Sequence, residues 1–184
     1  MEQIEWIRIA KPIDYAEMLA IMECKVDEVI NGGTEAIFLL EHSDCYTGGT
    51  SANPEDILDT NIKIYQTGRG GKYTYHGLGQ RVIYPILNLN KRGRDLKAYV
   101  RNLERWVINI LAHYGLDCFA EPERIGIWTK SQGLEKKIAA IGIRVKKWVT
   151  FHGIAVNINT DLSKYNAIIP CGISDFGITS LQDF

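Results

Sequence analysis

The sequence contains few cysteines, and their spacing excludes two common uses of that residue. The 184 residues include four of them, Cys24, Cys45, Cys118 and Cys171, and no two form a C-x-x-C pair. Neither a disulfide framework nor a zinc ribbon is indicated, so we expect reduced thiols. The nearest approach to a metal half-site is His42 with Cys45, but a second half with ligand spacing is missing. We therefore predict no bound metal.

The chain also lacks an excess of charge of either sign and a long apolar run. Its 21 Lys and Arg residues nearly balance 22 Asp and Glu residues, unlike the strongly basic proteins that bind nucleic acids or membrane surfaces. The first residues, MEQIEWIRIAK, contain no apolar stretch long enough for a signal peptide or a transmembrane span. We expect a cytoplasmic protein without nucleic-acid or membrane partners.

Length and composition favour a single folded unit. With 46% hydrophobic residues, a chain of this length can bury a substantial core. No repeat, low-complexity segment or Pro/Ser-rich linker divides it. We predict one domain, residues 1–184.

Two stretches have the periodicity of amphipathic helices, and short β-rich runs surround them. Apolar residues recur at spacings of three and four in residues 14–30 and 96–114, and Asp95 and Gly115 are placed as N-cap and stop signal of the second stretch. The β-rich runs are residues 4–9, 36–40, 62–66, 82–87, 126–129, 137–145 and 151–158. Because these runs do not alternate regularly with helices, we predict an α+β fold, a mixed or antiparallel sheet with flanking helices.

Five glycines gather in residues 67–80, flanked by strand-like sequence. We expect an irregular loop whose N–H groups form a nest for phosphate, carboxylate or an acyl oxyanion. A dinucleotide fingerprint would need glycine in place of Tyr73, and a P-loop would need glycine in place of Gln66, so both nucleotide motifs fail. A glycine-rich hairpin connection remains an alternative, with His76 as a hydrogen-bonded structural histidine.

Cys171 lies between Pro170 and Gly172, which places its thiol at a turn. A buried structural cysteine is the alternative. A nucleophilic role requires a thiolate, which a nearby cation would favour. Lys137 is one candidate for that cation, because strand alternation would send Lys137, Ala139 and Ile141 to one face and Ile138, Ala140 and Gly142 to the other. A solvated strand end is the alternative for Lys137.

Four motifs occur in a fixed order along the chain. R-G-G-x-x-T-x-H-G-x-G-Q spans residues 69–80, K-I-x-x-[IL]-G-[ILV]-R spans 137–144, F-H-G-x-A-x-N spans 151–157 and P-C-G spans 170–172. Together they resemble the lipoyl(octanoyl) transferase family, and the similarity runs through nearly all of the chain. Two features depart from the family pattern: Leu78 stands where proline is usual, and the chain ends sooner after Cys171 than in many relatives.

The resemblance implies an α+β fold similar to the catalytic domain of lipoate and biotin protein ligases. It implies an acyltransferase that moves an octanoyl group from octanoyl-acyl carrier protein to a lysine, without ATP or another cofactor. The acceptors would be the lipoyl domains of 2-oxoacid dehydrogenase E2 subunits and the glycine cleavage H protein. This reaction would be the first step of endogenous protein lipoylation.

The resemblance also assigns roles to residues of this chain. Cys171 would form the acyl-enzyme thioester, and Lys137 would lower the pKa of that thiol and handle protons. Three segments would line the acyl and oxyanion pocket: Arg69, Gly70, Gly71, Lys72, Tyr73, Thr74, Tyr75 and His76, then Ala140, Ile141 and Gly142, then Gly153, Ile154 and Ala155.

Two other functions remain open at this stage. An ATP-dependent lipoate or biotin ligase would share the fold but would need no nucleophilic cysteine. A noncatalytic module that binds acyl chains or lipoyl domains would never be acylated.

The densest basic run offers a docking surface for an acidic acyl carrier protein. It consists of Lys91, Arg92, Arg94, Lys97 and Arg101. A solvated loop and helix start is the alternative.

Overall fold

The computed structural model describes residues 3–169 and 176–184, and its main sheet is mixed. In order across the sheet, the strands are β1 (Ile4–Arg8), β2 (Glu35–Leu40), β6 (Gln80–Ile86), β10 (Val149–Asn157), β9 (Leu134–Lys146), β8 (Arg124–Ser131) and β7 (Cys118–Glu121), and β11 (Gly177–Ile178) also pairs with β9. β1 is parallel to β2 and β11 is parallel to β9, whereas the other pairs are antiparallel. The predicted α+β fold with a mixed sheet is confirmed.

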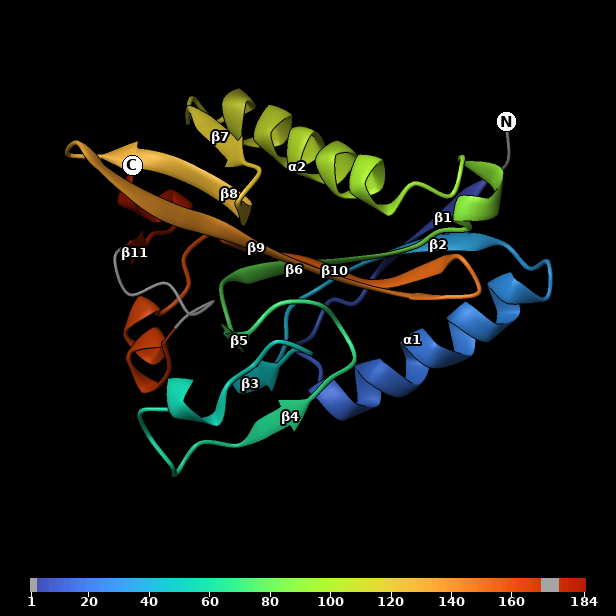
Figure 1. Ribbon diagram of the computed structural model, residues 1–184, viewed down its shortest axis with the longest axis horizontal. Coiled ribbons are helices and arrows are strands. Elements are labelled where there is room, and N and C mark those ends of the chain that lie inside the picture. Colours follow the sequence, from blue (N-terminus) through green and yellow to red (C-terminus); the bar gives the residue numbers. More distant parts are fainter. Residues whose placement is uncertain (1–2, 170–175) are drawn as a thin grey trace.

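One long helix covers each face of this sheet (Figure 1). α2 (Leu96–His113) lies on one face, and α1 (Tyr15–Ile30) lies on the other. Both helices begin with a side-chain cap, because the Asp14 carboxylate accepts the N–H of Ala16 at 2.8 Å and the Asp95 carboxylate accepts the N–H of Ala98 at 2.9 Å. The two helices predicted from the apolar periodicity are confirmed.

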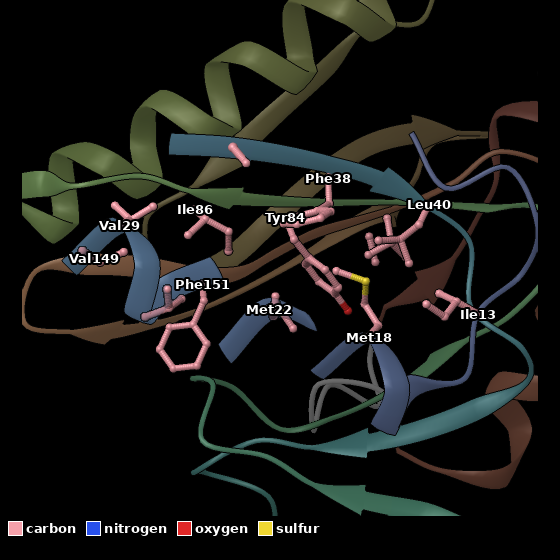
Figure 2. Packing of buried hydrophobic residues seen from close by; sticks show 14 residues of the cluster. Ile13, Met18, Met22, Val29, Phe38, Leu40, Tyr84, Ile86, Val149 and Phe151 are labelled. Atoms are coloured by element: carbon pink, nitrogen blue, oxygen red, sulfur yellow. The ribbon is translucent and has the colours of Figure 1, made fainter. Parts of the chain in front are cut away.

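The apolar stripes of the helices form two cores, one on each face of the sheet. Met18 and Met22 of α1 are fully buried, and Figure 2 shows them beside Tyr84 of β6 and Phe151 of β10. On the other face, Val107 of α2 packs into a cluster with strand residues. Burying each such side chain stabilises the fold by about 2 kcal/mol. The sheet is therefore held from both sides.

A second, smaller sheet lies on the α1 side of the main sheet (Figure 1). Its strand order is β4 (Ile64–Gln66), β3 (Cys45–Gly48) and β5 (Tyr73–His76). β5 corrects the expectation that residues 67–80 are irregular throughout. Its residues pair with β3, nearly thirty positions earlier in the chain, and this long-range pairing overrides the local glycine-rich pattern. β3 and β7 were not predicted either.

Short 3₁₀ helices complete the described structure, namely Pro54–Asp56, Leu89–Lys91, Leu162–Ala167 and Leu181–Asp183. No helix within residues 3–169 and 176–184 combines the length and the apolar character needed to cross a membrane.

A bulge in β9 reverses one predicted orientation. Ala139 pairs with Ile127 and Lys137 pairs with Trp128, so Ile138 is an extra residue opposite β8. Because neighbouring strand residues face opposite ways, Lys137 shares the face of Trp128, whereas Ala139 shares the face of Ile127, which packs under α2. The expectation that Lys137 and Ala139 point the same way is therefore wrong.

Candidate active site

Part of the edge of β9 is covered by the glycine-rich segment instead of by a strand. The β8 register ends at Ala139, whereas β10 pairs with β9 as far as Lys146. Beyond Ala139 the N–H of Gly70 donates to the carbonyl of Ile143 at 3.0 Å. A Cβ at Gly142 would lie 2.9 Å from the Gly70 carbonyl oxygen, so this close approach requires glycine.

Arg69 holds the fold of this segment with its guanidinium group. Its Nη2 donates to the carbonyls of Thr47 at 2.8 Å and Lys72 at 3.0 Å and to the Thr47 hydroxyl at 2.7 Å, and Nη1 donates to the Gly70 carbonyl at 2.9 Å. The side chain is buried. Lysine could not replace this residue, because only a planar guanidinium group donates to several carbonyls at once. Arg69 therefore shapes the pocket wall as a structural clamp.

Lys137 is buried in the wall beside this segment. The residue is 5% exposed, and its Nζ lies 5.2 Å from the ring centre of Trp128. Gly126, with φ of +133°, lies against the Lys137 side chain, where a Cβ would overlap Cε. The aromatic ring stabilises a buried ammonium group. The bulge, the ring and the glycine together direct this amine into the pocket that it lines.

The glycine-rich segment, β9, β10 and α2 enclose a pocket of about 520 Å³, a size typical of small-molecule sites. Most of the residues predicted to bind substrate line it together with Lys137, namely Arg69, Gly70, Gly71, Lys72, Thr74, His76, Ala140, Ile141, Gly142, Gly153, Ile154 and Ala155. Tyr73 and Tyr75 lie elsewhere, because alternation along β5 turns them into an aromatic cluster with Tyr46 and Tyr165.

Sequence reasoning missed part of the pocket wall. The additional lining residues are Tyr15, Tyr84, Leu96, Val100, Glu123, Arg124, Ile125, Ile143 and His152. Tyr15, Leu96 and Val100 belong to the apolar stripes of the two predicted helices, and the same periodicity marks a core and a pocket wall. His152 was within reach of sequence analysis, since it stands in the F-H-G-x-A-x-N motif.

Three buried histidines gather on the α1 side of this pocket. The ring centres of His42 and His76 are 5.6 Å apart, and those of His152 and Tyr84 are 6.2 Å apart. Burial lowers the pKa of His42 to about 4, that of His152 to about 3 and that of His76 well below its usual value. All three are therefore neutral at neutral pH. His76 is held by Gln80, whose Oε1 lies 2.7 Å from Nδ1.

The predicted nucleophile, Cys171, lies outside the described residues. The chain after it is anchored near Lys137: Phe176 packs edge-on against Trp128 at 5.4 Å between ring centres, and Ile178 pairs with Lys137. The proximity of Cys171 to Lys137 remains a prediction.

The other cysteines differ in their access to solvent. Cys45 and Cys118 are buried, and burial raises the pKa of the first to about 12 and that of the second to about 11. Cys24 is exposed on α1. Thiols with raised pKa values are poor nucleophiles, so Cys24 is the competitor to control for in any thiol-labelling experiment.

One residue of the basic run, Arg92, pairs with a buried carboxylate. Arg92 forms a bidentate ion pair with Glu35, in which Nη2 and Oε2 are 2.6 Å apart, and Glu35 is 3% exposed. Lys97 and Arg101 are exposed on α2, each one position after the pocket-lining residues Leu96 and Val100. A docking surface near the pocket would therefore use Lys97 and Arg101 more readily than Arg92.

Comparisons with known proteins agree with the geometry. The family model of the lipoyl protein ligase A/B catalytic domain matches residues 14–184. The chain is 53% identical over 184 residues to an octanoyltransferase of Rickettsia bellii. This alignment covers 97% of this chain and 88% of the relative. It is also 50% identical over 184 residues to an octanoyltransferase of Paramagnetospirillum magneticum. That alignment covers 98% of this chain and 86% of the relative.

Solved structures share the fold at low sequence identity. A lipoate-protein ligase A bound with ATP superposes with a TM-score of 0.79 at 20% identity, over 100% of this chain and 78% of that chain. A bipartite lipoate protein ligase from Thermoplasma acidophilum superposes with a TM-score of 0.72 at 18% identity, over 100% of this chain and 76% of that chain. These structures confirm the predicted similarity to the lipoate ligase fold.

Proposed function

The chain belongs to the lipoyl protein ligase A/B catalytic domain family, and on that premise we propose that it is an octanoyltransferase of protein lipoylation. Identities of 53% and 50% to relatives with that name, over nearly the whole chain, carry the proposal. The buried amine of Lys137 at the pocket supports it. We place the reaction in the cytoplasm, with octanoyl-acyl carrier protein as donor.

The first half of the reaction transfers the acyl group to the enzyme. The Cys171 thiolate attacks the donor thioester carbonyl, a new sulfur–carbon bond forms, and the carrier thiolate leaves. The Lys137 ammonium favours the attacking thiolate and supplies the proton that the leaving thiolate takes up. Exchange of one thioester for another is nearly isoenergetic, so this step is readily reversible.

The second half transfers the acyl group to the acceptor. The amine of a lysine on a lipoyl domain or on the glycine cleavage H protein attacks the Cys171 thioester, an amide bond forms, and the cysteine thiolate leaves. The neutral Lys137 amine accepts the proton that the attacking nitrogen loses, which restores the starting state. Covalent catalysis thus divides one difficult transfer into two easier ones.

Stabilisation of the oxyanion is assigned to backbone N–H groups of the glycine-rich segment. Gly70 already donates to Ile143, so the oxyanion donors are the N–H groups that follow it in residues 71–72. Each such donor contributes about 3 kcal/mol to stabilising the transition state in comparable enzymes.

Intact-mass analysis tests the proposal directly. Incubation with octanoyl-acyl carrier protein alone should leave one octanoyl adduct on the enzyme, and hydroxylamine should remove it. Cys171→Ser should abolish the hydroxylamine-sensitive adduct, whereas Cys24→Ser, the matched loss of an exposed thiol, should retain it. An adduct that forms on the acceptor only with ATP and free octanoate would establish a ligase instead.

A further inference from the structure

His152 has an unusual backbone conformation that turns its side chain toward α1. Its φ is +59°, in the left-handed region that few residues other than glycine adopt. Its N–H donates to Sδ of Met22 at 3.3 Å, and its ring stacks on Phe151 with centres 5.1 Å apart. Such strain persists where the surroundings impose it, and it is commonest at functional sites.

One nitrogen of this imidazole lacks a hydrogen-bond partner within the described part of the chain. His152 is 2% exposed, and its Nε2 has no hydrogen-bond partner among residues 3–169 and 176–184, while Nδ1 lies 3.5 Å from the Tyr15 hydroxyl. In the neighbouring His42, by contrast, both nitrogens are satisfied, at 3.0 Å from the Ile13 carbonyl and 2.8 Å from the Tyr84 hydroxyl. A buried polar atom without a partner is costly, so a ligand that satisfies Nε2 gains affinity.

The distance along the sheet from the Ala140–Ala155 pair to His152 matches a medium-length acyl chain. In the β9–β10 pairing, Ala155 opposes Ala140 and His152 opposes Ile143, so the two positions are three residues apart along each strand. At about 3.3 Å per residue this separation is about 10 Å. An extended octanoyl chain, with single bonds of about 1.5 Å at tetrahedral angles, spans about 9 Å.

We propose that His152 is a specificity-determining residue that forms a polar end wall of the acyl pocket, at the place reached by the eighth carbon of the chain. The inference rests on the proposed function, because it places the reacting carbonyl near Lys137, beside Ala140 and Ala155. A chain of eight carbons ends short of Nε2. A longer apolar chain presses methylenes against this nitrogen, whereas a chain with a terminal hydroxyl hydrogen-bonds to it.

Two donors of equal length test the polar wall in the unaltered enzyme. Nonanoyl and 8-hydroxyoctanoyl chains have the same number of non-hydrogen atoms beyond the carbonyl carbon, but only the second can bond Nε2. Loaded on acyl carrier protein, the hydroxylated chain should have a kcat/KM about tenfold higher than that of the nonanoyl chain, the effect of one satisfied buried hydrogen bond. An enzyme that transfers octanoyl groups but prefers the nonanoyl chain overturns the inference alone. An enzyme that transfers no chain from the carrier overturns the proposed function as well.

Two variants assign the effect to this residue. His152→Leu removes the nitrogen, and His152→Gln keeps a polar group of similar reach, while both bear the same backbone cost at positive φ. His152→Leu should raise the decanoyl-to-octanoyl ratio of kcat/KM about tenfold, and His152→Gln should leave it near the wild-type value. An unchanged ratio in an octanoyl-active His152→Leu enzyme overturns the proposal. If that variant does not fold, the comparison of the two donors decides.

Discussion

Gly126 of β8 lies directly against the side chain of Lys137 of β9. A Cβ on Gly126 would overlap Cε of Lys137 and lie 2.8 Å from the Ala139 carbonyl oxygen. Glu104, a buried residue of α2 whose pKa burial raises, lies near the backbone of Gly126. The start of β8 therefore lies between α2 and Lys137, and a glycine at this position leaves room for the amine.

Substitution of Gly126 should therefore act on Lys137. In Gly126→Ala the methyl group must displace the lysine stem, in addition to the strain of alanine at a φ of +133°. We expect octanoyl transfer to fall at least about 100-fold, the effect of a displaced catalytic group. Steady-state assays of the purified, folded variant measure this loss.

Gly133→Ala is the matched control. Gly133 also has positive φ, +79°, but a Cβ there meets nothing within 4 Å. It should lose about 1 kcal/mol of unfolding free energy and keep its activity. Equal activities for the two variants would show that Gly126 does not position Lys137.

Removal of the Lys137 charge should shift the ionisation of Cys171. In a Cys24→Ser background, Lys137→Met keeps the length and packing of the side chain but removes the cation. The pH midpoint of Cys171 alkylation by iodoacetamide should rise by about one unit or more, because the thiolate loses its favourable partner. Lys136→Met, on the neighbouring residue, should leave the midpoint unchanged. Coincident profiles for all three proteins would remove Lys137 from this role.

The local sequence pattern was sufficient to predict the helices and strands that have regular apolar periodicity. The helix stripes around Met22 and Leu103 and the strand around Ile154 repeat at helical or strand spacing because one face of each packs on the sheet. Since these elements are also the long ones, they determine the α+β architecture. The functional residues came from ordered motifs instead, and no periodicity points to them.

The features that escaped prediction depend on contacts of one segment with another. The bulge at Ile138 exists relative to β8 and reverses the face of Lys137. Tyr73 and Tyr75 were expected in a loop, but their pairing with β3 makes them part of a strand. Likewise, the basic run indicates positive charge, but it gives no sign that Arg92 is paired with Glu35, which is far away in the sequence. Partners remote along the chain leave no local signal.

Charge reversal on α2 should separate docking from structural roles in the basic run. Lys97→Glu with Arg101→Glu should lower kcat/KM for octanoyl-acyl carrier protein about tenfold at low salt and less at high salt, because the carrier is acidic and salt screens the attraction. Lys11→Glu, an exposed residue before α1, is the control. Loss of activity that does not depend on salt would argue against electrostatic docking.

Arg92→Ala should act on stability instead of docking. It leaves the buried carboxylate of Glu35 without its bidentate partner, which costs about 3 kcal/mol of unfolding free energy. Denaturant titration measures this loss. A weaker interaction with the carrier at unchanged stability would instead return Arg92 to the docking surface.

Because His42 is buried in its neutral form, the protein should lose stability in mild acid. Burial lowers its pKa to about 4, whereas an unfolded histidine titrates near 6.5, so the unfolded state binds more protons between these values. The free energy of unfolding should therefore fall as pH drops below 6.5, by about 1.4 kcal/mol per unit for this group.

Urea titrations of the wild type and His42→Asn isolate this contribution, because His76 and His152 titrate in both proteins. Asparagine removes the titrating group and keeps an amide near the Ile13 carbonyl that Nδ1 of His42 contacts at 3.0 Å. From pH 7 to pH 5 the wild type should lose about 2 kcal/mol more than the variant. Parallel curves over that range would mean that His42 becomes protonated without unfolding, which its burial between α1 and the sheet opposes.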